Sequence, residues 1–165
     1  MSSVELYIVT FDNEVKAQEA LDDLEQATKE GTLDIIDAAV MIREQGGKVD
    51  ISETSDPSTG RGAVVGGVIG GFIGLIGGPA GVGLGAAAGA ALAGYATSKM
   101  DLGIPDDELR SIADSLQPGT SALVVIVKDA WVDTLLAKLS TYGGIVNHHK
   151  LSDEAAAQLL DSPSE

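Results

Sequence analysis

The sequence has no cysteine and very few aromatic residues. Among its 165 residues there are one tryptophan, two phenylalanines and three tyrosines. The lack of cysteine excludes disulfides, thiolate nucleophiles and cysteine-based metal sites. Because aromatic side chains are scarce, a core has to be built from few large side chains.

Basic residues are scarce as well. Ten lysines and arginines stand against 25 aspartates and glutamates, which gives a formal net charge of -15. Binding to nucleic acid, and docking by charge to anionic lipid, both depend on clustered lysine and arginine, so we exclude nucleic acid as a partner. Residues 1–14 have no basic start and no apolar core followed by a cleavage site. We therefore expect no signal peptide and a cytoplasmic chain.

Charge is absent altogether from residues 62–96. This stretch of thirty-five residues is rich in glycine and alanine, and its glycines recur at every fourth position, which places them on one face of a helix. Glycine and proline between the two series can turn the chain sharply. The pattern predicts a glycine-zipper hairpin of two helices. Its first series is Gly62, Gly66, Gly70, Gly74 and Gly78, its second is Gly77, Gly81, Gly85 and Gly89, and its turn is Gly77, Gly78 and Pro79.

Such a hairpin needs a partner surface. Glycine lowers helix stability by about 1 kcal/mol relative to alanine, so the six glycines of residues 62–76 cost roughly 5 kcal/mol. Close packing of backbones along the glycine faces offsets part of this cost. The other faces still present an aliphatic surface that monomeric soluble proteins rarely expose. That surface consists of Val65, Val68, Ile69, Phe72, Ile73 and Ile76.

Three partners could bury this surface: lipid, other copies of the chain, or the chain's own domain. The two predicted helices, residues 62–76 and 80–98, would be roughly 22 and 28 Å long. The first is shorter than a hydrocarbon core of about 30 Å, so a shallow re-entrant hairpin fits a bilayer more easily than a spanning one. Arg61 and Lys99 flank the two ends, which agrees with both termini on the cytoplasmic side.

The rest of the chain reads as strands and amphipathic helices. Residues 4–11, 35–43, 48–53, 121–128 and 145–151 have strand character, and helices are expected from Glu14 to Gly31, from Pro105 to Leu116, over residues 131–139 and from Ser152. The segments LYIVTFDNEVKAQEALDDL and LVVIVKDAWVDTLLAKL share one pattern of strand, turn and helix. Two such halves predict an α+β ferredoxin-like sandwich with helices on one face of an antiparallel sheet.

The expected organisation is a small domain interrupted by an insertion. Residues 1–54 form the first half with an extra strand, 55–61 a linker, 62–98 the zipper hairpin, 99–151 a helix and the second half, and 152–165 a short helix and tail.

Several segments together resemble one family. These are LYIVTFDNEVKAQEALDDL, IDAAVMIREQGGKV, the glycine-rich insertion, LGIPDDELRSIADSLQPGTSALVVIVKDA and GGIVNHHKLS. The chain resembles the DUF1269 family, proteins of unknown function often labelled predicted membrane proteins or grouped with general stress proteins. The resemblance covers nearly the whole chain, and because the family has no established catalytic residues it implies no catalytic site here.

No segment predicts a chemical site. Residues 83–88 match a relaxed dinucleotide fingerprint but lack the preceding strand, and no P-loop motif is present. His148 and His149 are neighbours in the last strand, so they point to opposite faces, and we expect an exposed strand edge without a metal. The acids at 106–108 suit a helix N-terminus, those at 22, 23 and 25 a solvated helix face, and Trp131 the core or an interface.

The sequence therefore predicts a non-enzymatic protein that associates with itself and has no cofactor or metal. We expect the hairpin to insert in or bind the inner face of the cell membrane, with a role in stress response suggested by the family. A soluble homo-oligomeric particle, shell or filament with hairpins buried between subunits is the alternative. A small-molecule sensor that uses the sheet face is the second alternative.

Overall fold

A five-stranded antiparallel sheet forms the frame of the described structure. The computed structural model describes residues 3–46, 49–53, 107, 111–112, 115–153 and 156–157. The chain divides into two compact units, Met1–Thr54 with Leu116–Lys150, and Ser55–Ser115 with Leu151–Glu165. The first, which we call the sheet unit, contains all five strands of the described sheet and the helices packed against it.

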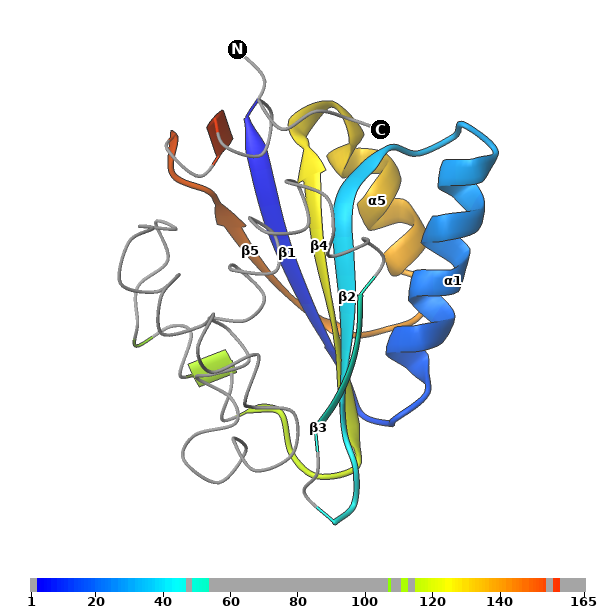
Figure 1. The fold of residues 1–165 in the computed structure, drawn as a ribbon, viewed down its shortest axis with the longest axis vertical. Coiled ribbons are helices and arrows are strands. Elements are labelled where there is room, and N and C mark those ends of the chain that lie inside the picture. Colours follow the sequence, from blue (N-terminus) through cyan, green and yellow to red (C-terminus); the bar gives the residue numbers. More distant parts are fainter. Residues whose placement is uncertain are drawn as a thin grey trace. The chain divides into compact units, whose positions relative to one another are not determined.

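The described sheet unit contains five strands, two α-helices and a 3-10 turn (Figure 1). Its elements are β1 (Val4–Phe11), α1 (Lys16–Lys29), β2 (Ile35–Arg43), β3 (Val49–Glu53), β4 (Thr120–Lys128), the 3-10 turn η1 (Asp129–Trp131), α5 (Val132–Leu139) and β5 (Ile145–Lys150). The strands are ordered β3-β2-β4-β1-β5, and each neighbouring pair is antiparallel. The predicted α+β class, with helices and an antiparallel sheet, is confirmed.

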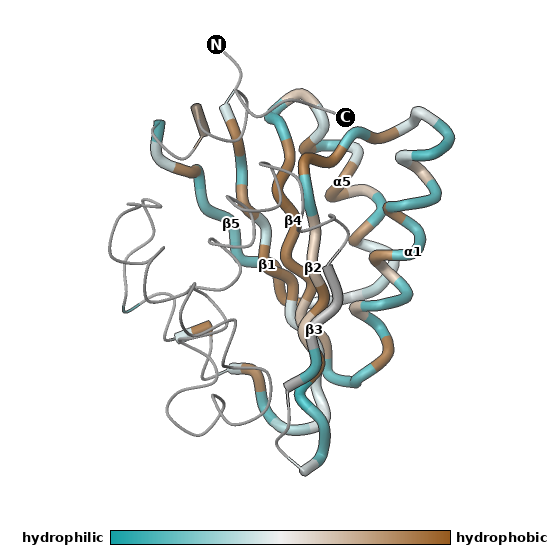
Figure 2. Tube along the Cα trace, viewed as in Figure 1, coloured by the Kyte–Doolittle hydropathy of each residue, from teal (hydrophilic) through white to brown (hydrophobic). Residues whose placement is uncertain are grey.

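Both α1 and α5 lie on the same face of the sheet (Figure 1). The core between them is formed by alternate residues of the strands, including Tyr7, Val9, Leu123 and Val125, and by the apolar stripes of the helices. Figure 2 shows that apolar residues dominate β4, whereas along α1 they alternate with polar ones. The buried positions of α1 repeat at helical spacing because one stripe faces the sheet; they are Ala17, Ala20, Leu21, Leu24 and Ala27.

Local chemistry explains where α1 begins and ends. The side-chain oxygen of Asn13 accepts hydrogen bonds from the amides of Val15 (3.0 Å) and Lys16 (2.8 Å), which satisfies donors that a helix start leaves free. At the other end Gly31 has a φ of +76°, and Thr32 donates its amide to the carbonyl of Ala27 (3.0 Å). This is a Schellman ending, in which glycine adopts the left-handed conformation without steric cost.

One buried hydroxyl ties α1 to the centre of the sheet. Ser121 on β4 is fully buried and donates its hydroxyl to the carbonyl of Asn13 (2.7 Å). The same oxygen accepts the amide of Ala17 (3.3 Å), so both partners are satisfied within the protein. The start of α1 is thereby held against β4.

The predicted strands and helices of the sheet unit agree with the observed ones to within about two residues, a normal scatter at helix ends. The helix expected from Glu14 begins at Lys16, and the helix expected from Trp131 begins at Val132 after the η1 turn. Between Pro105 and Leu116 the described residues Asp107, Ser111, Ile112 and Ser115 are helical. Among the described residues, no helix combines the length and the apolar composition needed to cross a bilayer.

Candidate functional site at the β5 edge of the sheet

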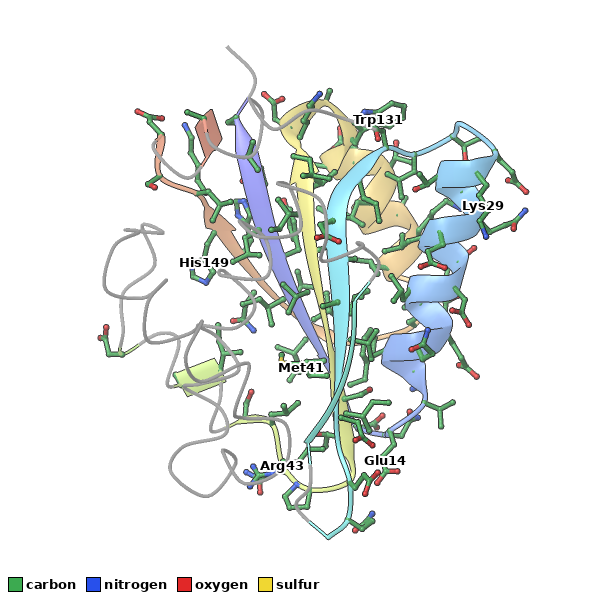
Figure 3. The ribbon with its side chains drawn as sticks, viewed as in Figure 1. Glu14, Lys29, Met41, Arg43, Trp131 and His149 are labelled. Carbon is green, nitrogen blue, oxygen red and sulfur yellow. The ribbon has the colours of Figure 1, made fainter. Side chains whose placement is uncertain are left out.

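β5 lies at the edge of the sheet and carries both histidines. It pairs with β1 from Thr10↔Ile145 to Glu5↔Lys150, with Tyr7 opposite His148 and Leu6 opposite His149. The two imidazoles therefore lie on opposite faces, as the sequence predicts. The expectation that both are exposed is wrong for His149, which is buried on the face away from the helices (Figure 3).

His148 forms a small polar cluster with Glu5 and Tyr7 on the helix-covered face. Its ring stacks on the Tyr7 ring with centroids 4.7 Å apart and planes inclined by 21°. Its Nε2 contacts the Oε2 carboxylate oxygen of Glu5, and Glu5 also accepts the hydroxyl of Ser3 (3.2 Å). The side chain of His148 is 49% exposed and that of Glu5 only 13%. The cluster joins β5 to β1 through side chains as well as through the backbone.

The phenol of Tyr7 is kept protonated in this cluster. Burial raises its pKa, and the carboxylates of Glu5 and then Asp133 raise it further, because a phenolate would be desolvated and repelled by both. A tyrosine with a raised pKa is a poor nucleophile and a poor base at neutral pH. Within the described residues there is also no group of three or more histidines and acids that could hold a metal ion. The cluster is suited to holding β5 in place.

A second polar cluster links the loop after α5 to α1. Tyr142 donates its hydroxyl to Asp23 (3.3 Å) and lies 3.4 Å from the carbonyl of Glu19, and Lys138 pairs with Asp23 (3.9 Å). Burial raises the pKa of Tyr142, with further contributions from Asp23 and the other acids of α1. Asp22 is exposed, as expected for a solvated helix face, whereas Asp23 is half-buried and takes part in this contact.

The second face of the sheet, opposite the helices, is apolar too. The register places Leu6, Ile8, Ala39, Met41, Ala122, Val124 and Ile126 on it. Figure 3 shows Met41 on the side of the sheet away from α1 and α5. The sequence reasoning missed this second apolar face. The signal was present, because AAVMI in β2 and ALVVIV in β4 are continuous apolar runs, which are typical of strands that are apolar on both faces.

The segment that joins β3 to β4 and contains the predicted insertion has both of its ends held on β2. Before the insertion, β3 pairs with β2 as far as Glu53↔Ala39. After it, the Arg43 guanidinium donates from Nη1 to the carbonyl of Leu116 (2.6 Å), and Gly119 donates its amide to the carbonyl of Arg43 (2.7 Å). The chain therefore leaves the sheet and returns to it at the same strand.

Trp131 lies at the start of α5 and packs against the core, as predicted (Figure 3). The predicted hairpin, its turn and its flanking charges all lie outside the described residues. They are Arg61, Gly62, Val65, Gly66, Ile69, Gly70, Phe72, Ile73, Gly74, Ile76, Gly77, Gly78, Pro79, Gly81, Gly85, Gly89 and Lys99.

A family model described as "Protein of unknown function (DUF1269)" matches residues 63–162, which is more than half of the chain. No curated protein and no solved structure matches the chain.

Proposed function

The chain belongs to the DUF1269 family, and because that family has no known function we propose a role from the chain's own residues. We propose that it is a non-enzymatic protein that associates with itself and whose residues 62–98 form a glycine-zipper hairpin that inserts in or binds a membrane. The acidic sheet unit stays in water on the cytoplasmic side.

The observation that carries this proposal is the position of the two ends of the segment that joins β3 to β4 and contains residues 62–98. Glu53 pairs with Ala39, and Leu116 is bonded to Arg43, so both ends are held on β2. A strand rises about 3.3 Å per residue, so the two anchor points on β2, four residues apart, are separated by roughly 13 Å. A segment whose ends are fixed at that separation can leave and return as a hairpin without disturbing the sheet.

The composition of the segment favours lipid as its cover. Residues 62–96 have no charged side chain, while the whole chain carries -15. Transferring Val65, Ile69, Phe72, Ile73 and Ile76 from water to an apolar phase is favourable by about 1.5–3 kcal/mol for each fully buried side chain. Small residues on the zipper faces also let two helices pack closely within lipid.

A soluble homo-oligomer is the second candidate. The exposed apolar residues Ile145 and Val146 on the edge strand favour it, since they offer a contact surface that does not need a membrane. In such an assembly the hairpins would be buried between subunits.

The experiment that tests the proposal is fractionation of the expressed chain, followed by imaging of the purified material. Lipid association predicts recovery in the membrane pellet. The double variant Gly70→Leu, Gly74→Leu should abolish assembly through the hairpin while the sheet unit still folds, because leucine blocks close packing of the zipper. A variant that kept the native oligomer size and lipid partitioning would contradict the zipper. The double variant Ile69→Leu, Ile73→Leu is the matched control, since it changes neighbouring positions off the glycine face and keeps them aliphatic. A native chain recovered as a discrete soluble particle would favour the second candidate, and a small soluble species would contradict both.

We also infer that the sheet unit is a ferredoxin-like sandwich with one added edge strand. The order β2-β4-β1-β5, with α1 joining β1 to β2 and α5 joining β4 to β5, supports this assignment. In each half a strand of the other half lies between the two strands that the helix connects, which is the split βαβ arrangement. An experimental structure of the sheet unit tests it.

A further inference from the structure

β5 exposes apolar side chains on both of its faces. Among the described residues, the exposed large hydrophobic side chains are Val15, Ile145 and Val146, and two of the three belong to β5. Ile145 is 70% exposed and Val146 is 45% exposed. Because neighbouring residues of a strand point to opposite faces, one of them lies on each face of the sheet. Single exposed aliphatic residues are ordinary, but a consecutive pair on an edge strand forms a contact surface.

The backbone of β5 also has one side available. All six residues pair with β1 in one continuous register, and in the described part of the sheet β5 has no second neighbour. Natural edge strands are usually protected by proline, by a bulge or by several charges. β5 reads IVNHHK, with no proline and with Lys150, at its end, as its one permanently charged residue. The strand is therefore weakly protected against pairing with another strand.

The charge around β5 differs from that of the rest of the chain. Residues 134–152 contain no aspartate or glutamate, although the chain has 25 of them, and they include Lys138, Lys150 and both histidines. Two chains with a net charge of -15 repel each other, and this repulsion is weakest where acids are missing. On the neighbouring strand, Glu5 is 13% exposed and its carboxylate contacts His148.

We propose that β5 is an edge for self-association, at which the β5 strands of two copies pair antiparallel across a twofold axis. The twofold brings identical rows of backbone donors and acceptors together, as an isologous contact requires. It continues the antiparallel pattern of the sheet, places the helices of both copies on the same face, and buries Ile145 and Val146 of each copy. A second copy fits better than an acidic peptide because two lysines provide little positive charge and the exposed residues are aliphatic.

The contact is independent of the glycine-rich insertion. A strand of six residues is about 20 Å long, and interfaces below about 1,200 Å² belong to weak or transient complexes. We therefore expect β5 pairing alone to have a dissociation constant in the micromolar range. When the hairpins also hold copies together, the two contacts strengthen each other through effective concentration.

Cysteine scanning tests the contact directly, because the chain has no cysteine and so no background. Single cysteines are introduced at Ile145, Val146, Asn147 and His148 in the full chain, with Val15→Cys as the control at an equally exposed aliphatic residue on another element. A disulfide needs Cβ atoms about 3.5–4.5 Å apart, so mild oxidation should give a covalent dimer that peaks at one or two adjacent positions of β5. Yields no higher than that of Val15→Cys at all four positions would overturn the proposal.

A second measurement separates this contact from association through the hairpin. In the Gly70→Leu, Gly74→Leu background, sedimentation equilibrium should still show a monomer–dimer equilibrium. Val146→Lys should weaken it about tenfold or more by placing a charge in the seam, while Val15→Lys, which changes the net charge equally, should leave it unchanged. If Val146→Lys and Val15→Lys behave alike, β5 is not the contact. Loss of assembly through the hairpin in the same background, with β5 pairing retained, would show that the two contacts are independent of each other.

Discussion

The residue before β5 gives the sharpest stability prediction. Gly144 approaches β1 so closely that a Cβ atom there would lie 2.5 Å from Cγ1 of Val9, 2.8 Å from Cε1 of Phe11 and 2.9 Å from the carbonyl oxygen of Thr10. Val9 and Phe11 belong to the core under the helices, and the Thr10 carbonyl is backbone. None of the three can yield freely, so Gly144→Ala forces the start of β5 away from β1.

The expected loss follows from the cost of overpacking a well-packed site, which is about 1–3 kcal/mol. Because one of the three clashes is with backbone, we expect the upper part of that range, about 2–3 kcal/mol in the free energy of unfolding. For a domain of about 60–100 residues, such as the sheet unit, each kcal/mol lost from the free energy of unfolding lowers Tm by about 4–8 °C. Tm should therefore fall by about 10–20 °C. Circular dichroism during thermal and urea unfolding measures both quantities.

Gly46→Ala is the matched control, since no atom lies within 4 Å of a Cβ at Gly46 and its φ is not positive. Alanine there should change stability by no more than about 1 kcal/mol, with stabilisation the favoured direction because the unfolded chain loses freedom. Equal unfolding free energies for the Gly144 and Gly46 variants would refute the reasoning about close approach.

Three further predictions follow from single contacts. Ser121→Ala should lower the free energy of unfolding by about 1–3 kcal/mol in urea titrations, because it leaves the Ala17 amide and the Asn13 carbonyl without their buried partner. Ser140→Ala removes an exposed hydroxyl and should be nearly neutral, so similar losses for both variants would contradict this prediction. Gly31→Ala should cost about 1 kcal/mol through its φ of +76°, and an unchanged urea midpoint would count against the Schellman ending. Because the folded pKa values of Tyr7 and Tyr142 are raised, their stabilising contribution is complete below the unfolded value near 10 and is lost as pH rises above it. Stability should therefore fall above about pH 10, less steeply in Tyr7→Phe, and a flat profile to pH 11 would argue against buried phenols.

Local sequence determined the elements of the sheet unit. Periodicity and turn chemistry within a few residues predict three of these features: the strand at Val4–Phe11, the end of α1 before Gly31, and the helix after Trp131. These signals can be recognised without knowing the fold. The opposite directions of His148 and His149 were predictable for the same reason, since alternation is a property of any strand. Family membership was legible as well, from segments spread along the chain.

Tertiary structure decided how these elements use their surfaces. The sequence around Ser121 does not indicate that its hydroxyl donates a hydrogen bond to Asn13, 108 residues away. From the sequence alone Gly144 is a turn residue, and its close approach to β1 is visible only in the folded structure. The exposure of Ile145 and Val146 depends on β5 being the last strand in the order β3-β2-β4-β1-β5, which is settled by long-range pairing. Periodicity shows that a strand has an apolar face, but only the neighbours of that strand determine whether the face is covered and whether its edge is free.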